Sequence, residues 1–314
     1  MKRKELSILS KFSGNKAVNY AMYAKIKDGF LTVTNLNSSA AVPINHKGNG
    51  FVEFDLLKKV LAKNDIESII FKDGFCELQC SKKVFKFEEG KDINFPCNHV
   101  GEIFENSVSL NVTSDLLSFK KFTLKDPLRP YFSGLYWSKN FVATNAQFMI
   151  WGNAPTIHKD VLLHEDFFNI PEGNYTVSFS KKNVKFEGEI NFVLPLLNER
   201  FPNYEAVIPY ENDKKITFSK KDMLELLENS LIVNNKISSI DSFGNIEAID
   251  IDSGSEFKGK LSTFNSVGEI KISFNPNLMK IILATCGENI TIDLSTPNRG
   301  MIIDSNKLLM PVLI

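Results

Sequence analysis

The chain has 314 residues, 43% of them hydrophobic and 26 of them phenylalanine, which supplies two or three separate cores and excludes a disordered or fibrous protein. Lys and Arg together number 37, as do Asp and Glu, so the formal net charge is zero. The chain has no overall basic excess that would indicate a nucleic-acid or membrane partner. Any attraction to phosphate therefore has to be local.

The N-terminal residues are basic but lack the long apolar run of a signal peptide or a membrane span, which predicts a cytoplasmic protein with no membrane partner. The four cysteines have neither zinc-ligand spacing nor a Cys-x-x-Cys pair. We therefore expect buried thiols, no metal and no cofactor. The cysteines are Cys76, Cys80, Cys97 and Cys286.

Six segments have the capping residues and apolar spacing of helices. In chain order they are residues 6–12, residues 56–61 capped by Asp55, residues 114–125 opened by Thr113 or Ser114, residues 164–170, a helix with Leu224, Leu227 and Leu231 opened by a Ser219–Asp222 capping box, and a helix from Asn275–Pro276 to Gly287. Strand-like runs bounded by turn residues lie between them, for example residues 30–35, 141–145 and 246–250.

The positions of these helices repeat along the chain. One kind starts near residues 5, 114 and 219, with steps of 114 − 5 = 109 and 219 − 114 = 105. The other starts near residues 55, 164 and 275, with steps of 164 − 55 = 109 and 275 − 164 = 111. The spacing predicts an α+β protein with three repeated domains, each with two helices packed on antiparallel sheet, over residues 1–106, 107–210 and 211–314.

Five stretches resemble segments of the bacterial β sliding clamp, the processivity subunit of DNA polymerase III. The resemblance covers the second and third repeats well and the first repeat only by its organisation. The stretches are DPLRPYFSGLYW from Asp126, VATNAQFMIW from Val142, ERFPNYEAVIP from Glu199, SFNPNLMKIIL from Ser273 and the terminal LLMPVLI. The chain is similar to a divergent and shortened member, and the resemblance implies a non-enzymatic protein with the DNA clamp fold.

In that family two subunits pair head to tail into a ring around duplex DNA, with helices lining the hole. A ring needs only weak, sequence-independent phosphate contacts, and lysines on the helices supply them. The resemblance also implies DNA contacts by Arg129 and Tyr131 and a looser counterpart at Lys16. The expected DNA-binding residues are Lys16, Lys58, Lys59, Lys63, Lys120, Lys121, Lys125, Arg129, Tyr131, Lys220, Lys221 and Lys280.

The resemblance further implies a hydrophobic cleft that receives short peptides of DNA polymerase, the clamp loader and repair proteins. The apolar C-terminus agrees, because leaving such side chains in water costs roughly 1.5–3 kcal/mol each. The cleft brings together the Phe-Pro-x-Tyr strand, the turn near Thr144 and the C-terminus. Its expected residues are Phe132, Thr144, Ala146, Met149, Pro202, Val207, Leu278, Leu308, Met310, Pro311 and Val312.

This chain departs from the family pattern in the cleft. The family usually has Asp-Gly-His-Arg on the turn, where this chain has residues 145–148 as Asn-Ala-Gln-Phe, and an arginine often follows the tyrosine strand, where this chain has Ala206. We expect a less polar and less basic cleft with a different partner motif. For the dimer interface, the resemblance suggests that Phe85 and Phe87 meet Leu231 and Ile232 of the other subunit, although alternation of Phe85 and Phe87 also fits a core face.

Two alternatives stay open. A metal-dependent hydrolase built around Asp250 and Asp252 is possible, but the four histidines are scattered and no calcium loop is present. The other is a clamp-fold scaffold or decoy of a phage or mobile element that binds a protein partner without encircling DNA.

Overall fold

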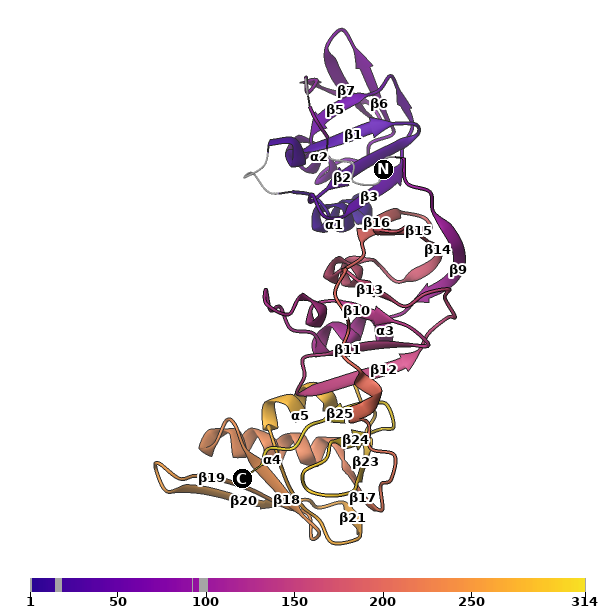
Figure 1. Cartoon of the computed structure of the whole chain (residues 1–314). Helices are drawn as coiled ribbons and strands as arrows, with labels where there is room; N and C mark the ends of the chain where they lie inside the picture. The colour runs from indigo at the N-terminus through magenta and orange to yellow at the C-terminus, as the bar shows by residue number, and fades with distance from the viewer. Residues whose placement is uncertain (1, 15–18, 92, 96–100, 314) are drawn as a thin grey trace. The chain divides into compact units, whose positions relative to one another are not determined.

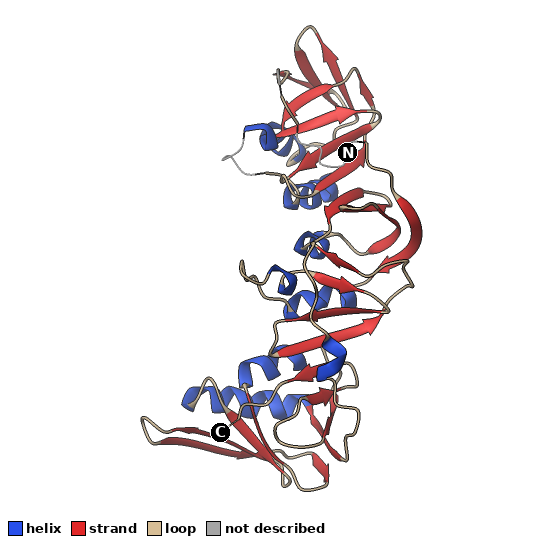
Figure 2. Ribbon diagram, in the orientation of Figure 1, coloured by secondary structure: helices blue, strands red, loops and turns tan. Residues whose placement is uncertain are grey.

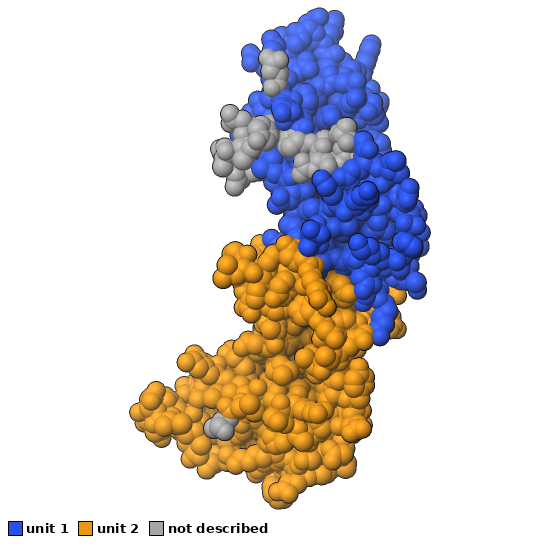
Figure 3. All heavy atoms as spheres, in the orientation of Figure 1, with its two compact units in different colours: residues 1–117, 137–139, 155–198 blue, residues 118–136, 140–154, 199–314 orange. Residues whose placement is uncertain are grey.

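The computed structural model describes residues 2–14, 19–91, 93–95 and 101–313. The chain divides into two compact units, in which α-helices accompany antiparallel sheet (Figures 2 and 3). Unit 1 comprises residues 1–117, 137–139 and 155–198, and unit 2 comprises residues 118–136, 140–154 and 199–314.

Unit 1 contains the first third of the chain and part of the second (Figure 1). Its helical elements are α1 (Arg3–Lys11), η1 (Asn19–Met22), α2 (Phe54–Leu61), most of α3 (Ser114–Ser118) and η4 (Glu165–Asn169). Its strands are β1 (Tyr23–Lys27), β2 (Phe30–Thr34), β3 (Ser39–Pro43), β4 (His46–Lys47), β5 (Gly50–Glu53), β6 (Ser68–Lys72), β7 (Phe75–Cys80), β8 (Lys83–Glu88), β9 (Glu105–Val112), β13 (Val161–Leu163), β14 (Gly173–Phe179), β15 (Asn183–Glu187) and β16 (Asn191–Pro195).

Two sheets contain all of these strands except β13. The larger has the order β5-β1-β2-β3-β16-β15-β14-β9 and the smaller β4-β6-β7-β8. The pair β3–β16 joins strands from the first and second repeats, with Ser39 opposite Val193 and Ala40 opposite Phe192. Helix α1 packs on β3 and α2, and the ring of Phe12, the residue that follows α1, lies 5.0 Å from the ring of Phe192. The larger sheet is therefore continuous across the two repeats.

Unit 2 contains the last third of the chain and the rest of the second. Its helical elements are η2 (Phe119–Phe122), η3 (Pro130–Phe132), η5 (Tyr204–Val207), α4 (Lys220–Val233) and α5 (Pro276–Leu283). Its strands are most of β10 (Leu135–Trp137), β11 (Asn140–Thr144), β12 (Phe148–Asn153), β17 (Lys214–Ser219), β18 (Ser238–Asp241), β19 (Asn245–Asp250), β20 (Ser255–Lys260), β21 (Phe264–Val267), β22 (Lys271–Phe274), β23 (Asn289–Leu294), β24 (Met301–Ile303) and β25 (Lys307–Leu309).

The sheets of unit 2 repeat the arrangement of unit 1. The strands of unit 2 run in the order β10-β11-β12-β25-β24-β23-β17-β21 in one sheet and β20-β19-β18-β22 in the other. The pair β12–β25 places Met149 opposite Leu308 and Ile150 opposite Lys307. It is the counterpart of β3–β16 at a step of 149 − 39 = 110 residues. Helices α4 and α5 pack on each other, and α4 also packs on β19 and β20.

The predicted α+β class and the recurrence of its helices are confirmed. Elements of the first kind start at residues 3, 114 and 220, and those of the second kind at 54, 165 and 276. The steps of the second kind are 165 − 54 = 111 and 276 − 165 = 111. The domain boundaries after residues 106 and 210 stay a prediction.

Several local predictions were wrong. The segment 114–125 is a short α3 followed by the 3₁₀ helix η2, and the stretch predicted as a Phe-Pro-x-Tyr strand contains the 3₁₀ helix η5. Ser219 forms no side-chain cap at α4, and Asp222 instead accepts hydrogen bonds from the backbone of Ser262 and Thr263. A tertiary partner outcompeted the local capping box, because Asp222 satisfies two backbone donors 40 residues away.

Candidate functional site

The C-terminal segment connects three parts of unit 2. It follows β25, and the backbone N–H of Met310 donates to the carbonyl of Gln147 at 2.8 Å. Two residues later, the N–H of Val312 donates to the carbonyl of Ser273 at 2.8 Å, just before Asn275 caps α5. The chain end therefore spans from the turn between β11 and β12 to the start of α5.

The predicted cleft residues at this place divide by exposure. Met149 and Leu308 are each 2% exposed and Phe132 is 4% exposed, so these three belong to the core. The others lie at the surface, either exposed or half-buried. We call this set the C-terminal surface: Thr144, Ala146, Leu278, Met310, Pro311 and Val312.

The segment with Pro202 and Val207 is held by a separate aromatic cluster. The rings of Phe201 and Tyr136 stack at 4.4 Å, and the hydroxyl of Tyr204 accepts a hydrogen bond from Asn140 at the start of β11. Pro202 is exposed and Val207 is 47% exposed. In the described part of the chain, no hydrogen bond or ring contact joins these two residues to the C-terminal surface, and their place in the cleft stays a prediction.

The turn between β11 and β12 is fixed by its own side chains. Thr144 Oγ1 donates to the carbonyl of Phe148 at 2.8 Å and accepts the N–H of Ala146 at 3.1 Å. Asn145 Oδ1 accepts the N–H groups of Gln147 and Phe148 at 2.9 and 3.1 Å. Ala146 has φ 75°, in the left-handed region that disfavours a residue with a Cβ.

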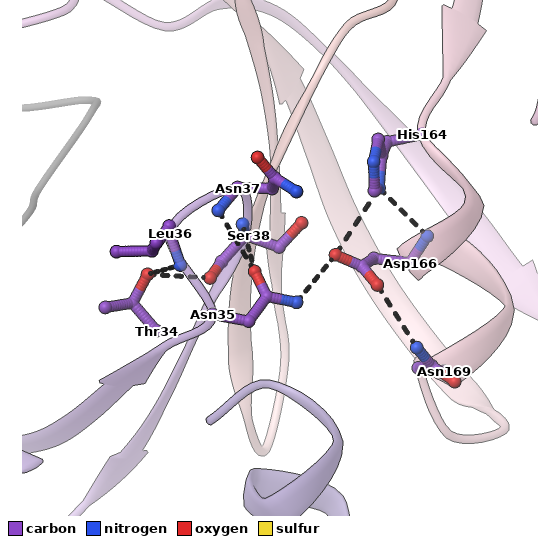
Figure 4. A network of polar contacts seen from close by, with 8 residues as sticks. All are labelled: Thr34, Asn35, Leu36, Asn37, Ser38, His164, Asp166 and Asn169. Carbon is purple, nitrogen blue, oxygen red and sulfur yellow. Dashed lines mark hydrogen bonds and ion pairs between the residues drawn. The ribbon is translucent and has the colours of Figure 1, made fainter. Parts of the chain in front are cut away.

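The turn between β2 and β3 has the same construction, at a step of 144 − 34 = 110 residues. Thr34 donates to the carbonyl of Ser38 and accepts the N–H of Leu36, whose φ is 81°. Asn35 Oδ1 accepts the N–H groups of Asn37 and Ser38 at 3.1 and 2.8 Å. Figure 4 shows this turn facing η4. The repeated Thr-Asn steps were visible in the sequence, and this signal could have predicted the matched turns.

The turn between β2 and β3 donates a hydrogen bond to the buried carboxylate of Asp166. Asn35 Nδ2 donates to Asp166 Oδ2 at 3.0 Å, and Asn169 Nδ2 donates to Asp166 Oδ1 at 3.3 Å (Figure 4). His164 Nδ1 lies 3.4 Å from Asp166 Oδ2. Burial by itself would raise the pKa of Asp166, but the contacts with His164 and Asn35 outweigh it and lower that pKa to about 2. Asp166 is thus an ionised acceptor at neutral pH.

Replacing Ala146 with glycine is expected to raise the free energy of unfolding by about 0.5 kcal/mol, because it removes the left-handed penalty and recovers more than the added chain entropy. Ala146→Val is expected to lower it by about 1–2 kcal/mol, because a β-branched residue fits this φ poorly. Urea unfolding measures both. Ala206, an exposed alanine in η5, is the control, and Ala206→Gly should destabilise. A destabilised Ala146→Gly variant would show that φ at this residue imposes no strain.

The predicted DNA-binding residues differ in how freely their charges face solvent. Lys58 pairs with Asp55, Lys220 Nζ donates to the carbonyl of Cys286 at 2.9 Å, and Lys280 pairs with Glu228 at 3.2 Å. Lys59, Lys63, Lys120, Lys121, Lys125 and Lys221 are exposed. Two placements on helices were wrong, because α2 ends before Lys63 and η2 ends before Lys125.

Arg129 is fixed by its neighbours. Its Nε donates to Asp126 Oδ2 at 2.7 Å, and its guanidinium lies 5.1 Å from the ring centroid of Phe132. This pairing also lowers the pKa of Asp126. Tyr131 is half-buried and packs edge-on against Phe132. Lys16 and Cys97 lie outside the described residues.

The predicted interface residues lie on two separate elements. Phe85 and Phe87 are half-buried on β8, the last strand in the order of the smaller sheet of unit 1. Leu231 and Ile232 belong to the last turn of α4. Ile232 is 82% exposed, which is unusual for a large aliphatic side chain.

The acidic residues of the hydrolase alternative are used locally. Asp250 Oδ1 accepts the N–H of Asp252, and Oδ2 accepts the hydroxyl of Ser253, which together lower the pKa of Asp250. Within the described ranges, no group of three or more His, Cys, Asp or Glu side chains could hold a metal ion. No helix in the part of the chain that the structure describes is both long and apolar enough to span a membrane.

Known structures share this architecture over nearly the whole chain. The DNA polymerase III beta subunit of Thermotoga maritima aligns with a TM-score of 0.79 at 18% identity, covering 99% of this chain and 97% of that one. The chain has the sliding-clamp fold. The beta chain of Streptococcus pneumoniae aligns with this clamp fold at a TM-score of 0.81 and 16% identity, again covering 99% and 97% of the two chains.

A third neighbour carries a ligand. The DNA polymerase III beta subunit sliding clamp of Pseudomonas aeruginosa, in a structure bound to griselimycin, aligns at a TM-score of 0.79 and 17% identity over 99% of this chain and 97% of that one. No protein-family model matches the sequence, and no curated protein matches it. The clamp fold is thus preserved here at a level of sequence identity that leaves few individual residues in common.

Proposed function

We propose that this protein is a DNA sliding clamp. Two copies pair head to tail into a ring around duplex DNA, and the C-terminal surface docks peptide segments of DNA polymerase, the clamp loader and other replication or repair proteins. The observation that carries this proposal is the alignment of 99% of the chain, at TM-scores near 0.8, with structures that are sliding clamps. Each subunit contributes three domains, over residues 1–106, 107–210 and 211–314.

Ring closure uses two sheet edges. In the described sheets, β8 ends one four-stranded sheet and β20 ends another. Unpaired edge strands offer backbone N–H and C=O groups to another chain. Pairing β8 of one subunit with β20 of the next brings Phe85 and Phe87 toward Leu231 and Ile232, and it covers Ile232, which is 82% exposed in the single chain.

Contacts with DNA are weak and independent of sequence. The exposed lysines of the helical segments, led by Lys59, Lys120 and Lys121, meet the phosphates, while enclosure supplies the retention. A formal net charge of zero is consistent with weak phosphate contacts and retention by enclosure, because tight binding to phosphates would slow sliding. The role is mechanical and cytoplasmic, and it needs neither a catalytic group nor a cofactor.

The C-terminal surface is the proposed docking site. Half-buried Met310, Pro311 and Val312 lie between a strained turn and the start of α5, and methionine adapts readily to different apolar ligands. The Pseudomonas aeruginosa clamp bound to griselimycin shows that this fold holds a ligand in that protein.

Enclosure can be tested without a loader. A duplex is anchored to a bead by one end, the protein is added, and the free end is then capped with streptavidin before a wash at about 1 M salt, which screens phosphate contacts. We expect the protein to stay on DNA capped after its addition, to leave uncapped DNA, and to be excluded from DNA capped beforehand.

The order of addition is the control, because ordinary phosphate binding ignores it. Retention that is independent of the cap, or no retention at all, would contradict the clamp proposal. The second result would favour a clamp-fold scaffold or decoy of a phage or mobile element that binds a protein partner without encircling DNA.

A further inference from the structure

We infer that Asn145 is a specificity determinant of the C-terminal surface, where its side-chain amide donates a hydrogen bond to a carboxylate of the docked peptide. The partner segment therefore carries an Asp, a Glu or a C-terminal carboxylate beside its apolar residues. This inference rests on the proposed peptide docking and names the chemistry of the docked segment.

The turn fixes the direction of this amide. Asn145 Oδ1 is held by two backbone N–H groups, those of Gln147 and Phe148, so Nδ2 is held on the side away from them. Nδ2 carries two hydrogens and can donate two hydrogen bonds. In the described part of the chain, Asn145 Nδ2 makes no hydrogen bond, and Asn145 itself is half-buried. The turn that presents this oriented donor also offers the Gln147 carbonyl, which accepts the N–H of Met310.

The matched turn in unit 1 shows what such a donor accepts. Asn35 is held by the same pair of backbone N–H groups, and its Nδ2 donates to the carboxylate of Asp166 at 3.0 Å (Figure 4). Asp166 is 8% exposed, so this charge is kept in the interior by its hydrogen bonds. At the turn between β2 and β3, the chain thus already contains the asparagine–carboxylate hydrogen bond that we infer for Asn145.

The counterpart of Asp166 is missing beside the second turn. Asp166 is the second residue after the cap His164, and Asn277 is the second residue after the cap Asn275, at a step of 277 − 166 = 111. Asn277 has no negative charge, and its Nδ2 is turned to the carbonyl of Asn235 at 2.8 Å. The turn with Asn35 finds its carboxylate, Asp166, within the chain. For the turn with Asn145, we infer that the docked peptide supplies the carboxylate.

The local charge favours an anion over a neutral acceptor. Residues 142–151 and 308–313 contain no Asp or Glu that would repel a carboxylate. Hydrogen bonds to an ionised acceptor are roughly twice as strong as neutral ones. A peptide with an acid at the right position should therefore be selected over the same peptide with the amide.

A peptide panel tests the pairing. Acetylated and amidated heptapeptides with a Leu-Leu-Phe core carry Asp, Asn or Ala at each flanking position in turn, and fluorescence anisotropy measures their affinity for the full chain. At one position we expect the Asp peptide to bind wild-type protein about tenfold more tightly than the Asn peptide. Asn145→Asp keeps the acceptor for both backbone N–H groups but replaces the donor by a negative charge, and it should abolish the preference for the Asp peptide.

Asn35→Asp is the matched control, because it makes the same change at the turn that faces Asp166. It should lower the melting temperature through repulsion of Asp166 and leave the peptide preference intact. Peptides that bind without any preference for Asp, or a preference that survives Asn145→Asp, would overturn the role of Asn145 alone. Failure of every peptide to bind wild-type protein would overturn peptide docking at this surface as well.

Discussion

Replacing Ile232 with glutamate is expected to convert the proposed dimer of 2 × 35.5 = 71.0 kDa into a monomer of 35.5 kDa. Ile232 is 82% exposed in the single chain, in the last turn of α4, so the change should leave the subunit fold intact. Burying a carboxylate without a partner costs several kcal/mol, which would weaken the dimer by at least about a hundredfold. Light scattering at micromolar concentration measures the mass, and salt-resistant retention on capped DNA should be lost with it.

Ile103 provides the matched control for this variant. It is 76% exposed just before β9, a strand that the proposed interface does not use. Ile103→Glu introduces the same charge at another highly exposed isoleucine and should leave both the mass and the retention unchanged. A monomeric wild-type protein, or an Ile232→Glu variant that still forms the dimer, would rule out this interface.

Replacing Asp166 with asparagine is expected to lower the free energy of unfolding at neutral pH by an amount on the order of 2 kcal/mol. The pKa of Asp166 is lowered from 3.8 to about 2 in the folded chain, so the carboxylate stabilises the fold at pH values above 3.8. This contribution falls as the pH decreases from about 4 toward 2, and the wild type and the variant should converge there. Denaturant unfolding at several pH values measures the difference.

Asp73 is the control in the same unit. Its side chain is 80% exposed beside Lys72, and its φ of 53° suits asparagine equally well, so Asp73→Asn should change stability little at any pH. A difference between wild type and Asp166→Asn that stays constant down to pH 2 would mean that packing of the side chain, and not its ionisation, stabilises this junction.

The sequence by itself determined the elements whose causes are local. The Asn275–Pro276 start of α5 is one example, because the cap accepts N–H groups only two and three residues away and proline preorganises the first turn. The step of about 110 residues between corresponding elements was also visible in the sequence, because the capping residues and turn residues recur in each repeat. Together these features were sufficient to predict three α+β repeats, whereas the resemblance to the clamp family came from the five stretches that start at Asp126, Val142, Glu199, Ser273 and Leu308.

Only the tertiary structure decided which residues distant in sequence contact one another. Asn35 and Asp166 are 131 residues apart, and no local pattern indicates that they meet. Asp222, which the sequence assigned to a helix cap, is used by a loop 40 residues away. Met149, Leu308 and Phe132, predicted for the cleft, are buried in the core instead. The physical reason is the same in each case: the partner that satisfies a polar group, or the neighbours that bury an apolar one, are chosen by long-range strand pairing and not by sequence proximity.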